Sequence, residues 1–183
     1  MASTTPIQQS GRSTLHKPCL PKSGPVWLKT LREIAFNRLS SIGFPNKHWE
    51  EWRLLDVSPI TERDYAFALE EEVLTHDDFE RLAAFSPSRY RFVLVNGRIH
   101  SSPSDGHRLP PGVRVLDLAE DMVQEHLGQY ADHEHEPFTA LNTAMIEDTI
   151  CLHIAKGVTI DQPIHLQHVT VPQDQAIVTN PRI

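Results

Sequence analysis

Apolar residues near the start of the chain recur at the spacing of one helix face. They follow one another at steps of three and four positions, as the inward side of an amphipathic helix requires: Leu28, Leu31, Ala35, Leu39 and Ile42. Pro25 suits the first turn of a helix, and Gly43 suits its end. The pattern predicts a helix from Val26 to about Ser41, and an extended stretch over residues 44–60.

Two further segments carry helix signals at their ends. Thr75, followed by Asp78 three positions later, resembles a capping box, so we expect a short helix to begin there. The stretch from Asp117 to Leu127 also has a helical pattern and is closed by Gly128. Both segments are therefore predicted to be helices.

The clearest strand signal lies between these two segments. Residues 90–95 form a mostly apolar run, and Asn96-Gly97 separates them from a second short run at residues 98–100. An Asn-Gly pair accepts the positive φ angles of a type I′ turn. The sequence therefore predicts a β-hairpin centred on this pair.

The pattern changes after Thr149. Apolar and polar residues alternate over residues 150–154, and apolar residues resume at 158–160 and again at 164–166. Short strands at close intervals, with no helix between them, are typical of sandwiches, barrels and β-helices. Periodicity alone does not choose among these three architectures.

The first 25 residues differ in composition from the rest. They hold four prolines and seven Ser or Thr residues, with few apolar side chains to bury. Such a segment cannot offset the entropy lost on ordering, so residues 1–25 are expected to form a disordered tail. Residues 1–32 also carry five basic residues and no acid, so an organellar transit peptide is the alternative interpretation.

Composition narrows the class of protein. Hydrophobic residues make up 39% of the 183, and no apolar run exceeds five residues, so neither a membrane span nor a secretory signal is expected. Cys19 and Cys151 lie far apart with no CxxC motif, which excludes a disulfide scaffold, a zinc finger and a cluster bound by this chain's thiolates alone. The net charge of −7 disfavours nucleic-acid binding. We therefore expect a cytoplasmic protein.

The 11 histidines raise the question of a metal site. The run His133-Glu134-His135-Glu136 would place both imidazoles on one face of a strand, but its neighbours favour a solvated loop with acids ahead of a helix. His153 and His165 alternate out of phase with their apolar neighbours and are expected to face outward, while His168 lies where that phase reverses. Surface residues are the simpler interpretation of His153 and His165, while for His168 an in-phase position and a bulge or strand end are equally open.

Motifs for other chemistries do not occur. The sequence has no P-loop, no GxGxxG and no GxSxG. The carboxylate runs Glu50-Glu51 and Glu70-Glu71-Glu72 are interpreted as solvated faces, and Trp49 and Trp52 as core anchors rather than as an aromatic ligand platform. The residues therefore predict no catalytic, cofactor-binding or metal-binding site.

Three segments of the sequence carry motifs in a fixed order. The first segment, residues 45–60, carries Pro45, Glu51, Trp52, Arg53 and Asp56. The second is residues 92–98 (FVLVNGR), and the third is residues 138–144 (FTALNTA), followed by Lys156-Gly157-Val158 and residues 163–166 (PIHL). Together they resemble the SufB/SufD family of iron–sulfur cluster assembly proteins, and its SufD members more than its SufB members. Their order over residues 26–183 matches the order in the family.

The resemblance implies an α+β fold. A small, mainly helical N-terminal domain with a β-hairpin would span residues 26–136, and residues 137–183 would begin a right-handed parallel β-helix that is incomplete in this chain. The residues that the family uses for cluster, iron and ATPase binding would lie beyond Ile183. None of them is carried onto this sequence, and no cofactor is expected in it.

The resemblance also implies a function. We expect a non-catalytic scaffold subunit of a SufBCD complex in iron–sulfur cluster assembly, with a SufB-like subunit and a SufC-like ATPase as partners. The compartment would be the cytoplasm or, alternatively, the plastid stroma. The alternative function is a metal-dependent or carbohydrate-active enzyme with a β-helix or cupin-like fold, which would use the exposed histidines.

Overall fold

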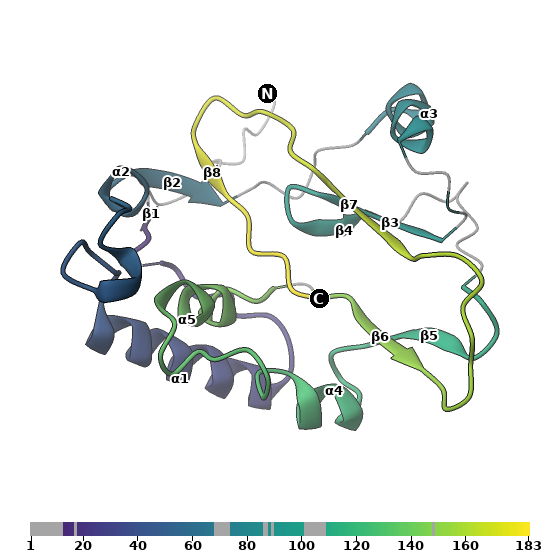
Figure 1. Cartoon of the computed structure of the whole chain (residues 1–183), viewed down its shortest axis with the longest axis horizontal. Coiled ribbons are helices and arrows are strands. Elements are labelled where there is room, and N and C mark those ends of the chain that lie inside the picture. Colours follow the sequence, from purple (N-terminus) through teal and green to yellow (C-terminus); the bar gives the residue numbers. More distant parts are fainter. Residues whose placement is uncertain are drawn as a thin grey trace, which may run out of the picture.

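The computed structural model describes residues 13–16, 18–67, 74–85, 88, 90–100, 109–147 and 149–183. The helices are α1 (Val26–Ile42), the short 3-10 helix η1 (Glu50–Trp52), α2 (Ser58–Thr61), α3 (His76–Ala84), α4 (Asp121–His126) and α5 (Pro137–Ala144). The strands are β1 (Ser13–Thr14), β2 (Asp64–Phe67), β3 (Arg91–Val95), β4 (Arg98–His100), β5 (Val113–Leu116), β6 (Cys151–Ile154), β7 (His165–Val169) and β8 (Ile177–Val178). Figure 1 shows α1 and α5 together along one side, with the strands above and beside them.

The predicted N-terminal helix is confirmed, and it packs against α5. Leu28, Ala35 and Leu39 on α1 are buried, as their spacing predicted. Burying each leucine stabilises the fold by roughly 1.5–3 kcal/mol relative to leaving it in water. On α5, Ala140 and Ala144 are fully buried. Their small side chains leave room for α1 to lie close.

The strands form three small sheets, and most of their pairings join distant parts of the chain. The sheet orders are β1-β2-β8, β4-β3-β7 and β5-β6. β3 pairs in parallel with β7, from Arg91 opposite His165 to Val95 opposite Val169, and β2 pairs in parallel with β8. β5 and β6 are antiparallel. Phe92, Leu94 and Ile150 form a second core beneath these strands.

The fold is a mixed α+β arrangement, and its described residues form no β-helix. The strands expected as the first rungs over residues 137–183 do not stack on one another. Each pairs instead with a strand from the first 116 residues, as the sheet orders show. The alternation after Thr149 correctly predicts strands, but alternation carries no information about the partner of a strand. β3, buried at four of its five positions, is an apolar partner that β7 can cover.

Part of the segment expected to be a disordered tail lies against the body of the protein. β1 pairs with β2, Leu15 joins the helix-pair core, and Pro18 is buried. Residues 21–23 are held by a polar contact that composition does not reveal, because the carbonyl oxygens of Pro21 and Ser23 accept hydrogen bonds from the buried Arg32 side chain. The first 12 residues lie outside the described part of the chain.

The predicted capping box and hairpin are confirmed. The Asp78 carboxylate accepts hydrogen bonds from the backbone N–H (3.0 Å) and hydroxyl (2.6 Å) of Thr75, and the Asp78 N–H donates back to that hydroxyl. In the hairpin, Asn96 and Gly97 adopt φ of 50° and 86°, and Val95 lies opposite Arg98. Both features are specified by neighbouring residues, so the sequence predicts them well.

Two local predictions were less accurate. The helix expected from Asp117 begins only at Asp121, because Asp117 and Glu120 instead close a turn in which the Asp117 N–H donates to the Glu120 carboxylate (2.9 Å). Residues 44–60 are not extended, since they contain η1 and the start of α2. No described helix is both long and apolar enough to span a bilayer.

Candidate functional site

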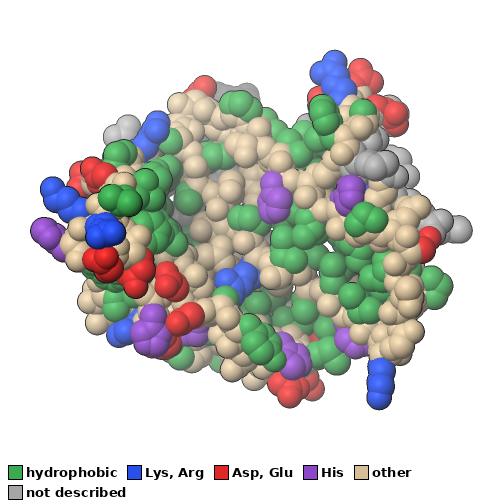
Figure 2. All heavy atoms as spheres, viewed as in Figure 1, with side chains coloured by type: hydrophobic (Ala, Val, Ile, Leu, Met, Phe, Trp, Pro, Cys, Tyr) green, Lys and Arg blue, Asp and Glu red, His purple; other side chains and the backbone are tan. Residues whose placement is uncertain are grey.

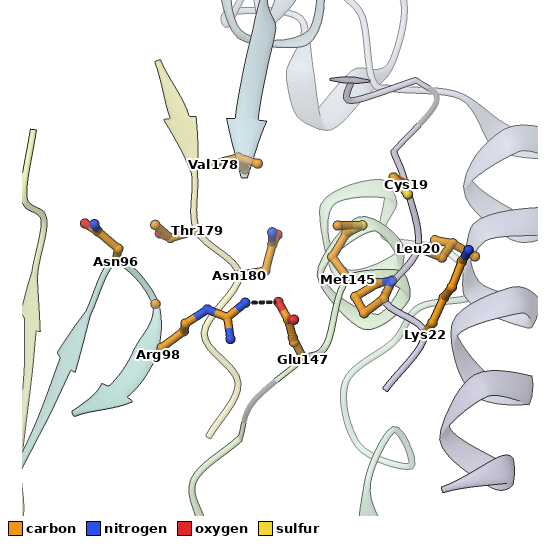
Figure 3. Close-up of a pocket in the computed structure, with 12 residues that line it drawn as sticks. Cys19, Leu20, Lys22, Asn96, Arg98, Met145, Glu147, Val178, Thr179 and Asn180 are labelled. Carbon is orange, nitrogen blue, oxygen red and sulfur yellow. Dashed lines mark ion pairs between the residues drawn. The ribbon is translucent and has the colours of Figure 1, made fainter. Parts of the chain in front are cut away.

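A pocket of about 340 Å³ lies where four segments from different parts of the chain meet. These segments are residues 19–22 ahead of α1, the turn at residues 96–98 between β3 and β4, the residues that follow α5, and residues 178–180 near the C-terminus. Figure 3 shows their side chains arranged around one space. No two of these segments are neighbours in the sequence, so the pocket depends on the whole fold.

Arg32 holds the first wall of this pocket in place. It lies on α1 and is 1% exposed. Its Nε donates to the Ile146 carbonyl oxygen (2.7 Å), and its Nη1 donates to those of Pro21 and Ser23. One guanidinium therefore joins α1, the residues after α5 and the segment that precedes α1. Burial lowers the pKa of Arg32, which the nearby Glu147 partly offsets, and the group remains charged.

The second wall is the hairpin turn, which lies directly against residues 178–180. The Asn96 side-chain oxygen accepts a hydrogen bond from the Val171 N–H (2.9 Å), and the Asn96 N–H donates to the Val169 oxygen (2.8 Å). A Cβ atom added at Gly97 would lie 3.0 Å from Cβ of Thr179, which is too close for an ordinary contact. Glycine is therefore needed here both for its positive φ and for this close approach.

The charged groups of the pocket form an ion pair and one further cation. Nη2 of Arg98 lies 2.6 Å from Oε2 of Glu147, and these side chains are 30% and 40% exposed. Figure 3 shows the two groups facing one another, with Asn180 beside them and Lys22 on another wall. The Glu147 carboxylate is paired with Arg98, and the described lining contains no histidine. The pocket is therefore better suited to binding an acidic or polar group of a ligand than to transferring protons.

The predicted histidine cluster lies away from this pocket, and its interpretation as a loop is confirmed. Residues 133–136 form a turn ahead of α5, and His135 Nδ1 lies 2.9 Å from the Asp132 carboxylate. Hydrogen bonds from His135, and from the Glu134 N–H, lower the pKa of Asp132. The segment is joined to α1 through Arg38, whose Nε donates to the Glu134 carbonyl oxygen.

The strand histidines also lie apart from one another. His153 is on β6, and His165 and His168 are on β7, in a different sheet. His153 and His165 are half-buried and do not face outward as predicted, whereas His168 is exposed, in agreement with a reversal of phase at this point of the strand. Within the described ranges, no three His, Cys, Asp or Glu side chains come together as a metal site would require.

The remaining described candidate residues lie outside the pocket. Trp52 packs against Phe138, with ring centroids 5.5 Å apart. Trp49 and Trp52 are both half-buried, so neither is the core residue that the sequence predicted. Glu50 and Glu51 are exposed, and Glu70-Glu71-Glu72 lies outside the described residues. Cys151 is half-buried, and burial, together with Glu120, raises the pKa of its thiol.

Sequence reasoning missed Arg32, which organises the pocket more than any other residue. The signal was present, because Arg32 interrupts the apolar face formed by Leu28, Ala35 and Leu39. A single cation within an apolar helix face must find acceptors when that face is buried. Asn96 and Asn142 were considered only as parts of motifs, although the side chain of each forms a hydrogen bond to a backbone group distant in the sequence.

Comparison with protein families matches residues 15–166 to the SufBD protein N-terminal region. The chain belongs to the SufBD family. This match confirms the family suggested by the three sequence segments. The matched range includes three of the four segments that line the pocket, whereas residues 178–180 lie beyond it.

A curated relative points to the same process. The chain is 29% identical over 160 residues to a protein of Synechocystis sp. named as an iron–sulfur cluster assembly SufBD family protein. The aligned region is 83% of this chain and 34% of the relative, so the chain spans about a third of the relative's length. No solved structure matches the chain.

Proposed function

We propose that this SufBD family protein is a SufD-like, non-catalytic scaffold subunit in iron–sulfur cluster assembly. The observation that carries the proposal is the family match over residues 15–166, together with the named process of the Synechocystis relative. The SufD-like role rests on the resemblance of the three sequence segments to SufD members of the family. Cys19 and Cys151 are not paired with one another, and burial raises the pKa of the Cys151 thiol.

The proposed partners are a SufB-like subunit and a SufC-like ATPase. The chain has no phosphate-binding glycine loop, so ATP hydrolysis would be the work of the ATPase partner. The complex would work in the cytoplasm or, in a plant or alga, in the plastid stroma. The cluster itself would be cargo of the complex.

The proposal extends to the fold of a longer protein. In a protein of the relative's length, a right-handed parallel β-helix would follow the described strands. The parallel pairs β2–β8 and β3–β7 support this extension, because parallel pairs already join strands through long crossovers here.

A metal-dependent or carbohydrate-active enzyme has less support. It would require His153 and His165 to converge with a third ligand, but they lie on strands of different sheets. We therefore do not propose this second function.

Depletion of the protein in its source cells tests the proposed process. We expect the activity of a [4Fe–4S]-dependent hydro-lyase to fall several-fold while a hydro-lyase that needs no cluster keeps its activity. Expression of the wild-type gene should restore the lost activity. Equal activity of both enzymes in depleted and undepleted cells, under iron limitation as well, would contradict the proposal.

A further inference from the structure

Three large aliphatic side chains on one short segment, outside the pocket, are exposed to solvent. Leu54 is 92% exposed, Leu55 is 57% exposed and Ile60 is 52% exposed. We refer to these three residues as the aliphatic patch. Figure 2 shows hydrophobic side chains gathered over the segment from η1 to α2, at the left of the view, with charged side chains around them. Single exposed leucines are common on protein surfaces, whereas exposed apolar side chains gathered in one place are typical of docking surfaces.

The segment that carries the patch is firmly held. Trp52 packs on Phe138, and Val57 and Thr61 are each 4% exposed. The Leu55 N–H donates to the Trp52 oxygen (2.9 Å), and the Tyr65 hydroxyl donates to the Ile60 oxygen (3.0 Å). The inward residues thus fix the backbone while the patch faces water. This segment would therefore lose little conformational entropy when a partner binds to it.

The charges around the patch indicate what kind of partner it fits. Residues 50–62 carry four carboxylates, Glu50, Glu51, Asp56 and Glu62, all exposed. The cations are Arg53, which lies 3.3 Å from Glu50 and is partly neutralised by it, and Lys47 and Arg63, which flank the segment. The N–H of Ser58 donates to Asp56 (3.0 Å) and lowers its pKa, so this carboxylate stays ionised at neutral pH. Lys47 also helps to lower the pKa of Asp56. With Asp64 counted, residues 47–64 hold five carboxylates against three cations, a net charge of −2. The surroundings of the patch are therefore acidic.

We propose that the aliphatic patch docks a basic amphipathic helix of a partner protein. The apolar stripe of such a helix would cover Leu54, Leu55 and Ile60, and Lys or Arg residues along its flanks would face the carboxylates. A second copy of this chain would bring like charges together at the same surface. An anionic membrane would be repelled for the same reason.

Binding of designed peptides to the full chain tests this proposal. The first probe is a labelled helical peptide with leucines at three- and four-residue spacing and lysines on both flanks, and the second carries glutamates in place of the lysines. Fluorescence anisotropy would measure their dissociation constants for the wild-type protein, Leu54→Ser/Leu55→Ser, and Val26→Ser. Val26 is 78% exposed and lies at the start of α1, so this last variant is a matched control.

We expect the lysine peptide to bind the double variant at least tenfold more weakly than the wild type, and Val26→Ser to bind like the wild type. The glutamate peptide should bind at least tenfold more weakly than the lysine peptide. Glu51→Gln/Glu62→Gln should weaken lysine-peptide binding and reduce its salt dependence. All substituted residues are exposed, and an unchanged thermal midpoint would show that the variants are folded.

Three results would overturn the proposal. The first is equal lysine-peptide binding by the wild type and the folded double variant. The second is self-association in sedimentation that the double variant abolishes, because the patch would then bind a second copy. The third is binding to phosphatidylglycerol vesicles that depends on Leu54 and Leu55, because the partner would then be a membrane.

Discussion

The helix pair α1 and α5 and the strand region are held together in different ways. In the helix pair, the apolar spacing along α1 already identifies Leu28 and Leu39 as core residues, and both are buried. In the strand region, β7 reaches back to β3 and β8 reaches back to β2. The partners of these strands lie more than 70 positions away in the sequence. The strand pairing therefore depends on how the whole core packs and not on the local sequence pattern.

Both regions nevertheless rely on polar side chains that bind distant backbone. Arg32 does this for the helix pair, and Asn96 does it for the strands. Asn142 joins the two regions, because it donates to the Pro181 oxygen (3.1 Å) and accepts from Arg182 (3.0 Å). The comparison shows that apolar faces supply most of the burial, while a few polar residues decide which segments come together.

Replacement of Arg32 should have the largest effect on stability. Arg32→Ala leaves three carbonyl oxygens without their cationic donor and opens a space beside α1. We expect the free energy of unfolding to fall by about 3 kcal/mol or more, measured by urea denaturation. Arg53→Ala is the control, because Arg53 lies in an exposed ion pair whose loss should cost about 0–1 kcal/mol. Equal losses in both variants would contradict the role given to Arg32.

Substitution of two glycines separates backbone strain from close approach in the strand region. Gly97 and Gly157 have nearly equal φ, 86° and 82°, but only Gly97 has neighbouring atoms within 4 Å of an added Cβ. Gly157→Ala should therefore cost about 1 kcal/mol from strain alone. Gly97→Ala should cost about 2–3 kcal/mol, because Thr179 must also move. A cost for Gly97→Ala no greater than that for Gly157→Ala would mean that residues 178–180 do not lie against the hairpin.

A double-mutant cycle measures the connection between the two regions. Asn142→Ala removes a hydrogen bond to each of two neighbours in the C-terminal segment, so we expect a loss of about 1–2 kcal/mol. Asn142→Ala and Arg182→Ala together should show a coupling energy of about 0.5–1.5 kcal/mol in urea denaturation. Strictly additive losses would show that α5 and the C-terminal segment are not coupled through this pair.

The smallest effect is expected at the exposed N-terminal cap of α3. Hydrogen bonds from Thr75 lower the pKa of Asp78. A lowered folded-state pKa means that the cap stabilises α3 at every pH above about 4, the ordinary Asp value, and is lost as the pH falls through the lowered folded value. The backbone chemical shifts of α3 should therefore remain helical from pH 7 to about 4 and move toward coil values below it.

Thr75→Ala should shift the α3 resonances toward coil at neutral pH, whereas Asp77→Asn should keep the cap and its acid transition. Neither variant should change the unfolding midpoint of the rest of the chain much. A loss of helical chemical shifts in α3 near pH 6 in the wild-type protein would count against the cap. So would helical shifts that persist at every pH.

The sequence predicts what adjacent residues specify. The capping box at Thr75 and the turn at Asn96-Gly97 are complete within four residues, and both were predicted correctly. The pocket could not be predicted, because it requires Lys22, Arg98 and Asn180 to meet from three separate segments. The ordering of residues 21–23 was missed for the same reason, since they are held by Arg32 and the composition of that segment does not reveal this contact.

Co-purification tests the proposed scaffold role most directly. The protein would carry an affinity tag fused to its N-terminus at its own chromosomal locus, so that whatever length the cell makes is captured. Elution fractions would be analysed by mass spectrometry with an untagged strain as control. We expect a SufB-like subunit and a SufC-like ATPase in near-stoichiometric amounts. Recovery of the tagged protein without either partner, from cells that express both, would contradict a role as a subunit of the cluster-assembly complex.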